Sequence, residues 1–389
     1  MIRGRWSLLS KNAALARSSH CSSISPSGLL VIYGGELTPR TPVDAGTGHK
    51  EAPAGSLHAI DLQHGSILRK WFSVAPSPSG GEALDQPAVP EPRVGATAVW
   101  QDDALYMWGG RGGKEMTPLD THQAGVWKAS LNLGQGPHGP SGSVRWERVF
   151  ATNEDDAPAS RSYHTAVVHG GKMYVHAGCP ETGRLSTLHA FDVQAQAWEE
   201  LAPAPEPGRG GTALVATTLA GSDRALLLRY GGFCGHELPA DAGTLDIYSI
   251  AENRWHTVKP GPDPTHGSPG PRSVHGFAPF QSRSPALVDA VAILYHGERD
   301  ASSLGHAGAG TFWSDVWLLL RTGGDGDILS GWAWRKVEIA NGDGHAPEGR
   351  GWFAPASWVG PDGNMRVVLF GGLLSSNTRS DELWELQLD

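Results

Sequence analysis

The sequence predicts an all-β fold, a six-bladed β-propeller whose last blade is closed by the N-terminal strand. Three observations lead to this prediction: one apolar strand pattern occurs six times, an arginine precedes each copy, and a tryptophan strand missing from the C-terminus stands at the N-terminus. Because the repeats run through all 389 residues, we expect one domain, residues 1–389, with no helix of consequence.

The repeated strand is short, apolar and ends in glycine. Its copies are "LLVIYGG" (29–35), "ALYMWGG" (104–110), "KMYVHAG" (172–178), "ALLLRYGG" (225–232), "VAILYHG" (291–297) and "RVVLFGG" (366–372). Their β-branched and aromatic residues favour a buried pleated surface, and glycine allows a positive φ angle where the strand turns. So many copies indicate a repeat architecture.

Each copy belongs to a unit of four predicted strands. An inner strand begins at an arginine: Arg17, Arg93, Arg161, Arg209, Arg272 and Arg350. A third strand follows each glycine, from Leu57, Val126, Leu188, Leu245, Val316 and Leu383, and a fourth is marked by Trp71, Trp146, Trp198, Trp255 and Trp334. The predicted blades therefore span residues 17–73, 93–148, 161–201, 209–258, 272–337 and 350–389.

The last unit reaches Asp389 without a tryptophan strand, and its missing strand is expected at residues 4–9, around Trp6. A ring closed in this way leaves no exposed sheet edge. The order of arginine, glycine and tryptophan resembles the kelch family over essentially the whole chain. Successive arginines lie from 48 residues (161 to 209) to 78 residues (272 to 350) apart, which brackets the roughly 50 residues of a kelch blade. An immunoglobulin-like array lacks this order.

Strand direction predicts which face of the propeller carries binding residues. Neighbouring strands are antiparallel, so the links that carry the arginines share a face with the links after each glycine. The long loops lie there, at residues 36–56, 111–125, 179–187, 233–244 and 298–314. Long loops at one end of a rigid scaffold usually hold the binding site.

The composition excludes several classes of partner. The net charge is −9 and no run of Lys or Arg occurs, so nucleic acid is not expected. No apolar stretch reaches the 18 residues of a membrane span, and the N-terminus lacks the apolar core of a signal peptide. Three widely spaced cysteines suggest reduced thiols. We therefore expect a cytoplasmic protein without a membrane partner.

The loop "HGERDASSLGHAGAG" (296–310) holds the main candidates for catalysis and metal binding, namely Glu298, Asp300 and His306. Carboxylates with an imidazole suit divalent iron, manganese or zinc, and three protein ligands leave positions open for a substrate. Glycines at 308 and 310 keep the approach clear. The alternative is a solvated turn that happens to contain a histidine.

The ring of arginines also has two interpretations. Guanidinium groups match sulfate, phosphate or carboxylate, which predicts an anion receptor at the channel mouth. Alternatively, arginines at these positions hold kelch blades together through backbone carbonyls.

This loop, together with "RSVHGF" at Arg272, resembles the plant specifier proteins: nitrile-specifier, epithiospecifier and thiocyanate-forming proteins. The resemblance implies an iron(II) site with Glu, Asp and His at fourth-residue intervals, acting on the aglucone of a glucosinolate. Glu298 and His306 match the first and third ligands; Ser302 stands at the middle position, with Asp300 two residues early. By the same resemblance, Arg93 and Arg161, then Arg17, Arg209 and Arg272, bind the anionic group of the substrate.

Three functions follow as alternatives. The first is a specifier-type lyase or isomerase, assisted by Fe(2+) at Glu298, Asp300 and His306, that acts on a small anionic sulfur- or nitrogen-bearing metabolite. The second is a kelch protein-interaction module that binds an acidic peptide. The third is a metal-free enzyme of secondary metabolism with His306 or His275 as acid or base and with aromatic walls. Those walls are Trp313, Trp352 and Phe353, although the two tryptophans could instead be packing residues.

Overall fold

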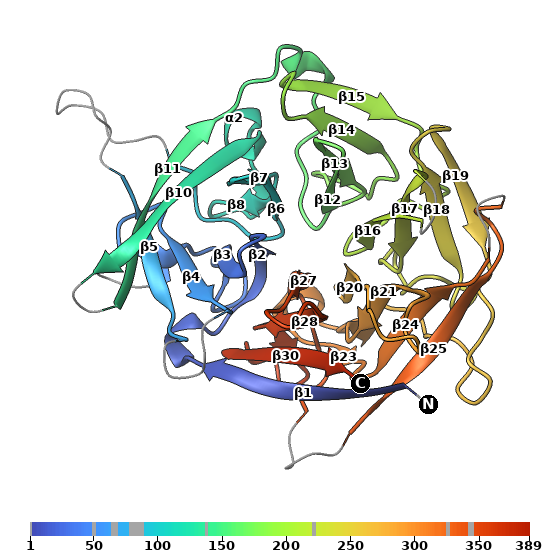
Figure 1. Cartoon of the computed structure of the whole chain (residues 1–389). Helices are drawn as coiled ribbons and strands as arrows, with labels where there is room; N and C mark the ends of the chain where they lie inside the picture. Colours follow the sequence, from blue (N-terminus) through green and yellow to red (C-terminus); the bar gives the residue numbers. More distant parts are fainter. Residues whose placement is uncertain are drawn as a thin grey trace.

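The computed structural model describes residues 2–48, 52–63, 69–77, 89–136, 139–219, 223–323, 327–340 and 346–389. Nearly all regular structure in these residues is β-strand, and the α-helices α1 (Ala45–Gly48) and α2 (Thr121–Ala124) are single turns. The strands surround a central space (Figure 1). The prediction of an all-β propeller is therefore confirmed. None of the described helices is long and apolar enough to cross a membrane.

The main strands form two four-stranded sheets and two eight-stranded sheets, and each eight-stranded sheet consists of two neighbouring groups of four whose outer strands pair at the rim (Figure 1). From the centre outward, the first group is β2 (Ser18–Ile24), β3 (Leu29–Glu36), β4 (Leu57–Asp61) and β5 (Phe72–Pro76), and the next is β6 (Thr97–Gln101), β7 (Ala104–Trp108), β10 (Trp127–Gly136) and β11 (Gly139–Arg148). Then follow β12 (Thr165–His169), β13 (Lys172–His176), β14 (Leu188–Asp192) and β15 (Ala197–Leu201), and β16 (Ala213–Thr218), β17 (Ala225–Tyr230), β18 (Leu245–Ser249) and β19 (Arg254–Val258). The remaining strands are β20 (Gly276–Pro279), β21 (Ala290–Tyr295), β24 (Val316–Arg321) and β25 (Trp332–Ile339), and β27 (Ala356–Val359), β28 (Met365–Phe370), β30 (Glu382–Leu388) and β1 (Ile2–Lys11).

Three short ladders lie outside the main strands: two within loops between a second and a third strand, and one that joins the turn before β27 to the loop after β28. They pair β8 (Arg111–Gly112) with β9 (Thr117–Pro118), β22 (Glu298–Asp300) with β23 (Thr311–Phe312), and β26 (Arg350–Gly351) with β29 (Leu373–Leu374). The single 3-10 turns are η1 (Ala13–Leu15), η2 (Glu154–Asp156) and η3 (Gly305–Ala307). These ladders give order to loops that carry candidate site residues.

The N-terminal strand completes the last group, as the sequence predicted. β1 is antiparallel to β30, with Trp6 opposite Leu386. The start of β1 also pairs in parallel with β25, where Ile2 is opposite Val337. Figure 1 shows β1 along the rim beside β30. β1 therefore links the group of strands that contains β25 to the group that contains β30.

A closed circle of backbone hydrogen bonds joins the groups around the axis. We call it the amide circle; its members stand two positions after each repeated arginine. The amide of Gly95 donates to Ser19 (2.9 Å), Tyr163 to Gly95 (2.8 Å), Gly211 to Tyr163 (2.8 Å), Val274 to Gly211 (2.7 Å), Trp352 to Val274 (2.9 Å) and Ser19 to Trp352 (2.6 Å). All of these residues have positive φ angles, an uncommon conformation for a residue with a side chain. The bonds offset that local strain.

The tryptophans of the outer strands explain why that residue marks the fourth strand. The indole of Trp146 donates to Gly55 in the loop of the preceding group (2.7 Å), and Trp334 reaches Gly243 in the same way (2.8 Å). Both side chains are buried between neighbouring groups. A tryptophan fits this position because its large apolar body fills the interface while its one donor satisfies a loop carbonyl.

Two details differ from the sequence prediction. The inner strands start after the arginines rather than at them: β12 begins at Thr165, beyond Arg161. The arginines instead hold the turns that lead into the strands. The third strand from Val126 is longer than its apolar pattern, because β10 and β11 continue as a hairpin as far as Gly136 and Gly139.

Candidate functional site

The repeated arginines are buried and bond to backbone carbonyls. Arg17, Arg93, Arg161, Arg209, Arg272 and Arg350 are each at most 5% exposed. In each one Nε donates to the carbonyl two residues earlier, and Nη1 donates to a carbonyl in the turn after the second strand. For Arg161 these acceptors are Ala159 (2.8 Å) and Ala177 (3.2 Å). The arginine thus fixes the start of an inner strand to the end of its neighbour.

This geometry favours the structural interpretation of the arginine ring. Burial lowers the pKa of Arg17, Arg161 and Arg209 to about 10, and guanidinium groups with such values remain charged at neutral pH. Three of the six also have acidic partners: Arg272 pairs with Asp315 at 2.7 Å, Arg350 with Glu382 at 3.1 Å and Arg209 with Asp246 at 4.0 Å. None of the five arginines predicted to bind substrate lines the two cavities described below.

The loop that follows β22 lies over the mouth of the ring, on the face that carries the amide circle. The His306 ring stacks on Tyr163, with centroids 6.2 Å apart and planes 12° apart, and meets Trp352 edge-on at 5.5 Å. The Ala307 carbonyl accepts a hydrogen bond from Asn377 Nδ2 (3.2 Å). These contacts come from other groups of the ring, so His306 lies on the face predicted to carry the binding loops.

The predicted iron ligands do not form one donor set. Asp300 is exposed, and its carboxylate accepts from Arg299 Nε (2.8 Å) and Thr311 Oγ1 (2.5 Å). Glu298 is only 6% exposed, and His306 is held against an aromatic ring. Among the residues that the structure describes, no three His, Cys, Asp or Glu side chains are close enough to hold a metal ion. These residues therefore do not fit the iron site that the specifier resemblance implies, and we derive no step through a metal.

Two of the three predicted residues instead line a cavity at the mouth of the ring. This mouth cavity has a volume of about 440 Å³. Its walls include Arg111, Tyr163, Arg184, Phe233, Glu298, His306 and Trp352. It combines aromatic faces, guanidinium groups and one buried carboxyl, the mixture that is typical of a ligand site.

Two arginines that the sequence analysis did not select form one wall of the mouth cavity. Arg111 donates through Nε to Ser162 Oγ (2.6 Å) and through Nη2 to the Cys179 carbonyl (3.4 Å). In the described part of the chain its Nη1 has no partner, so that nitrogen is available to a ligand. The Arg184 guanidinium is exposed and lies 4.9 Å from the centroid of the Phe233 ring.

The electrostatic surroundings of His306 are positive. Burial lowers the pKa of His306, and the charges of Arg111, Arg40 and Arg184 lower it further, whereas Glu36 acts in the opposite direction. Several cations near one carboxylate disfavour a further positive charge on the imidazole. The same potential attracts an anionic ligand to this side of the mouth.

A pair of buried carboxyls, Glu298 and Glu237, lies near Phe233. Burial raises the pKa of Glu298 to about 7, although the Gly310 amide and the Trp352 indole act against this shift. Glu237 is 9% exposed, and burial together with the charge of Glu298 raises its pKa to about 8. The Ser273 side chain acts against the shift at Glu237.

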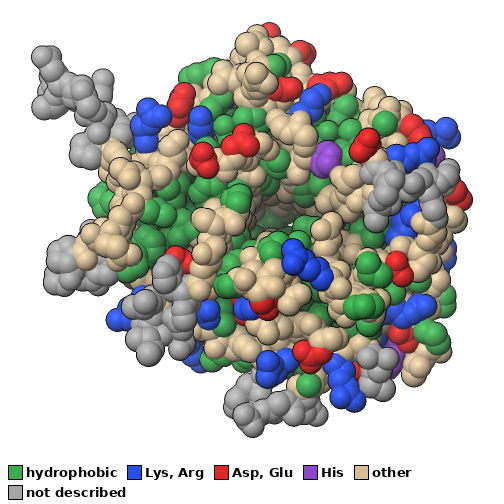
Figure 2. Space-filling model, viewed as in Figure 1, with side chains coloured by type: hydrophobic (Ala, Val, Ile, Leu, Met, Phe, Trp, Pro, Cys, Tyr) green, Lys and Arg blue, Asp and Glu red, His purple; other side chains and the backbone are tan. Residues whose placement is uncertain are grey.

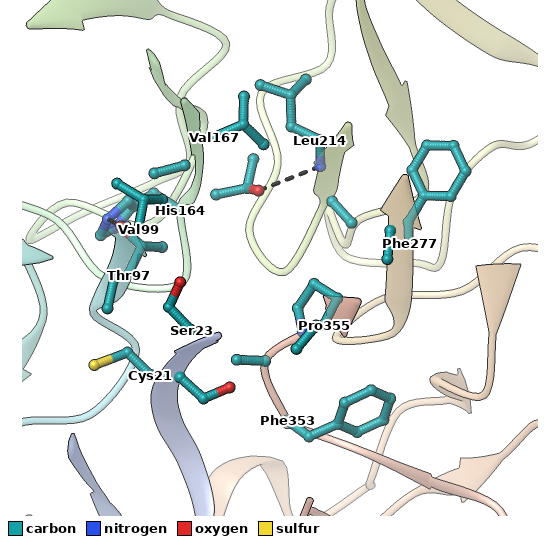
Figure 3. A pocket seen from close by; sticks show the side chains of 18 of the residues that line it. Cys21, Ser23, Thr97, Val99, His164, Val167, Leu214, Phe277, Phe353 and Pro355 are labelled. Carbon is teal, nitrogen blue, oxygen red and sulfur yellow. Dashed lines mark hydrogen bonds between the residues drawn. The ribbon is translucent and has the colours of Figure 1, made fainter. Parts of the chain in front are cut away.

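A second cavity, the axial channel, runs along the inner strands. It has a volume of about 360 Å³, and its lining is mostly small and apolar. Figure 3 shows Cys21, Ser23, Thr97, Val99, His164, Val167, Leu214, Phe277, Phe353 and Pro355 around it. Figure 2 shows the molecule hollowed at the centre of the ring. Tyr163 and Trp352 line both cavities, so they form the boundary between the channel and the mouth.

The predicted aromatic walls and His275 lie in different places. Trp352 lines the mouth cavity and Phe353 lines the channel. The Trp313 indole donates to the Pro271 carbonyl (3.0 Å) and lies beneath the Arg272 guanidinium at 5.2 Å, so it is a packing residue. His275 is 3% exposed, and burial lowers its pKa well below the ordinary value. It therefore stays neutral and is a poor acid.

Three residues of the mouth cavity escaped the sequence analysis: Arg111, Arg184 and Tyr163. Arg111 directly follows the glycine pair of the second unit, and Arg184 lies in the loop at residues 179–187. A search for charged residues in the long loops, rather than beside the inner strands, would have found both arginines. Tyr163 has no such signal, because its position depends on the positive φ angle that it adopts in the amide circle.

Comparison with known proteins supports the kelch assignment. The family model described as the KLHDC2/KLHL20/DRC7 kelch-repeats domain matches residues 82–284. The chain is 23% identical to kelch domain-containing protein 2 of Bos taurus over 278 residues, which is 67% of this chain and 61% of that protein. The match thus spans less than two thirds of the bovine relative.

Shorter sequence matches and a solved structure agree with this assignment. The chain is 27% identical to tip elongation aberrant protein 3 of Schizosaccharomyces pombe over 30% of its length and 11% of that protein. It is 29% identical to kelch-like protein 40 of Xenopus tropicalis over 27% of its length and 17% of that protein. A solved structure, described as the structure of YjhT, superposes with a TM-score of 0.58 and 16% identity, covering 98% of this chain and 100% of that one. At this identity the superposition supports the fold alone.

Proposed function

Because the chain belongs to the KLHDC2/KLHL20/DRC7 family of kelch-repeat domains, we propose that it is an interaction module whose mouth cavity binds an acidic peptide segment. One observation carries this proposal: Arg111 and Arg184 face a cavity of about 440 Å³ whose other walls are aromatic. Guanidinium groups form charge-assisted bonds with carboxylates, and aromatic faces pack against the peptide chain. The repeated arginines of the ring are not needed for this binding, because their guanidinium groups already donate hydrogen bonds to backbone carbonyls.

The geometry of the arginine wall supports an extended ligand with carboxylate side chains. Arg111 is fixed by Ser162 and by the Cys179 carbonyl, so little side-chain entropy is lost when it binds. Arg184 is exposed and rests on Phe233, where it stays accessible. Long loops contribute both arginines, in keeping with binding by loops on a rigid ring.

A binding assay tests the proposal. N-acetylated, C-amidated peptides that contain Glu should bind the full chain more tightly than the same peptides with Gln. Arg184→Gln should weaken binding about tenfold, the loss expected for one charge-assisted hydrogen bond. Arg145→Gln is the matched control, since Arg145 is exposed on β11. Equal binding of Glu and Gln peptides would refute the proposal.

A second candidate is a metal-free enzyme that uses the same cavity for acid–base chemistry. One observation favours it: the pKa of Glu298 is raised to about 7, so near neutral pH this carboxyl can both give and take a proton. His306 lies in the same cavity. Turnover of a small anionic metabolite that is lost in Glu298→Gln would support this activity.

The iron-assisted lyase or isomerase remains a prediction that the donor geometry does not favour. Metal analysis of protein purified without oxygen tests it, since near-stoichiometric iron would support a site at Glu298, Asp300 and His306. We also infer that the ring consists of six blades with β1 in the last. The amide circle supports this count, because each of its members comes from one repeat and the last bond returns to the first residue.

A further inference from the structure

Two neighbouring buried carboxyls have no cationic side chain as a partner among the described residues. Glu298 is 6% exposed and Glu237 is 9% exposed. No ion pair to a described residue involves either carboxylate, whereas Glu36 at the same mouth pairs with Arg379 at 2.7 Å. An isolated buried carboxylate is costly, so a site that keeps two of them is suited to a positive partner from outside.

One member of the pair, Glu298, faces the mouth cavity, and its charge acts on Glu237 nearby. Glu298 is part of the cavity wall, together with Ser273 and Ser302. The Glu237 carboxyl has Ser273 as a hydrogen-bonding neighbour and no cationic partner among the described residues, and it interacts electrostatically with Glu298. The Trp352 ring lines the same cavity, and its indole N–H interacts with the Glu298 carboxyl. Carboxylates beside an aromatic face make a favourable site for an ammonium or guanidinium group.

The mouth cavity therefore has a basic wall, where Arg111 and Arg184 lie with the exposed carboxylate of Glu181, and a second wall that holds the buried carboxyl of Glu298. Arg111 and Arg184 come from β8 and the loop at 179–187, whereas Glu298 comes from β22, and Phe233 from the intervening group completes the cavity between them. A purely acidic segment would satisfy the first wall and leave the second unpaired. A segment with one acidic and one basic side chain would satisfy both.

We propose that the mouth cavity recognises a peptide segment in which a Lys or Arg stands beside a Glu or Asp, with the basic side chain bound by Glu298 beside Trp352 and with Glu237 adding negative charge nearby. This inference rests on the proposed function and adds a second subsite to it. Glu298 becomes the residue that determines specificity among acidic segments.

The test uses N-acetylated, C-amidated tetrapeptides that differ only in charge: Gly-Glu-Arg-Gly, Gly-Glu-norleucine-Gly and Gly-Gln-Arg-Gly, with Glu and Arg also in reversed order. Affinities are measured by calorimetry with the full chain at pH 8. The peptide with both charges should bind at least about tenfold more tightly than the norleucine peptide, since one charge-assisted bond is gained. Glu298→Gln should reduce that ratio to within about twofold.

Controls separate this inference from the proposed function. Glu199→Gln removes an exposed carboxylate on β15 and should keep the full ratio. Glu237→Gln, a second variant, should lower the ratio partly, and melting curves establish that each variant is folded. If Glu peptides bind through Arg184 but Arg adds nothing, the second subsite is refuted and the proposed function stands. If only Gly-Gln-Arg-Gly binds, and does so through Glu298, the subsite stands and the proposed function fails.

Discussion

Burial sets the charge of the mouth residues more strongly than their neighbours do. Glu298 has a pKa near 7 and His306 a lowered pKa, and in both burial is the leading cause. The two groups therefore change charge in ranges unusual for their residue types. A residue that looks acidic in the sequence can be neutral in the cavity at pH 6.

The preference for a basic side chain should depend on pH through Glu298. Its carboxyl is ionised at pH 8 and mostly neutral at pH 6, because its pKa is raised to about 7. The groups around it are Glu237, Asp300, His306 and the Trp352 indole, and none of them supplies a fixed positive charge at pH 8. The affinity ratio of the Glu-Arg to the Glu-norleucine peptide should thus fall from pH 8 to pH 6. In Glu298→Gln the ratio should be flat, and a fall of equal size in that variant would contradict the assignment.

Buried histidines should make the fold sensitive to mild acid. Burial lowers the pKa of His20 and of His164 to about 3, so both are neutral in the folded chain. In the unfolded chain they ionise near pH 6.5, and therefore their contribution to stability is complete above pH 6.5 and is lost as the pH falls toward 3. Each costs about 1.4 kcal/mol of unfolding free energy per pH unit in that window.

Urea unfolding at pH 7 and pH 5.5 measures this loss. His164→Gln should reduce the pH dependence by about one proton, since Gln does not titrate. The hydrogen bond of His164 Nε2 to Thr97 Oγ1 (2.8 Å) would weaken, so the variant is also expected to be less stable at pH 7. An unchanged slope between the two pH values would show that His164 is not buried in its neutral form.

Arg161 should behave as a structural residue and not as a ligand-binding one. Arg161→Met leaves the carbonyls of Ala159 and Ala177 and the hydroxyl of Thr187 without their donor. We expect a loss of at least about 2 kcal/mol in unfolding free energy, with peptide affinity unchanged once the variant is folded. A loss of affinity without a loss of stability would restore the anion-receptor interpretation of this arginine.

At the scale of elements, β1 is the strand whose removal should matter most. It forms the antiparallel partner of β30 and extends to β25, so its loss exposes the edges of two strands. Deletion of residues 1–10 should lower the melting temperature strongly and promote aggregation through those edges. Light scattering during a thermal melt measures both effects. A truncated chain that melts like the full one would show that β1 is dispensable.

The strands were more predictable than the loops. The apolar pattern fixes a strand because alternate residues such as Val31 and Tyr33 must enter one core cluster. The pairing of Trp6 with the final strand followed from counting tryptophans, and the structure confirms it. The loop from Glu298 to Gly310 was placed on the correct face, but its internal contacts were not predictable. Asp300 turns toward Arg299 and Thr311, and no spacing rule indicates that choice.

At the scale of the whole molecule, the identity of the repeated arginines did not reveal their role, because their hydrogen-bond partners are backbone carbonyls of the turns. An arginine repeated in every unit suggests an anion site, yet its guanidinium matches two carbonyls of a turn equally well. Only the φ angles of the turn decide between these roles, and the sequence does not reveal them. The mouth arginines, Arg111 and Arg184, occur once each and therefore carry no repeat signal.

The amide circle has a consequence for how the molecule can open. Every amide in it points the same way around the axis, from each residue to its predecessor, and the last returns to the first. A helix or a ladder has ends from which it frays, whereas a circle has none. Solvent can reach these amides only if one hydrogen bond breaks while the two groups of strands beside it are still held by their other bonds. Such a local opening strains the rest of the ring. The protons on these six nitrogens should therefore exchange with deuterium among the slowest in the protein and at a common rate, because the six bonds open as one cooperative unit.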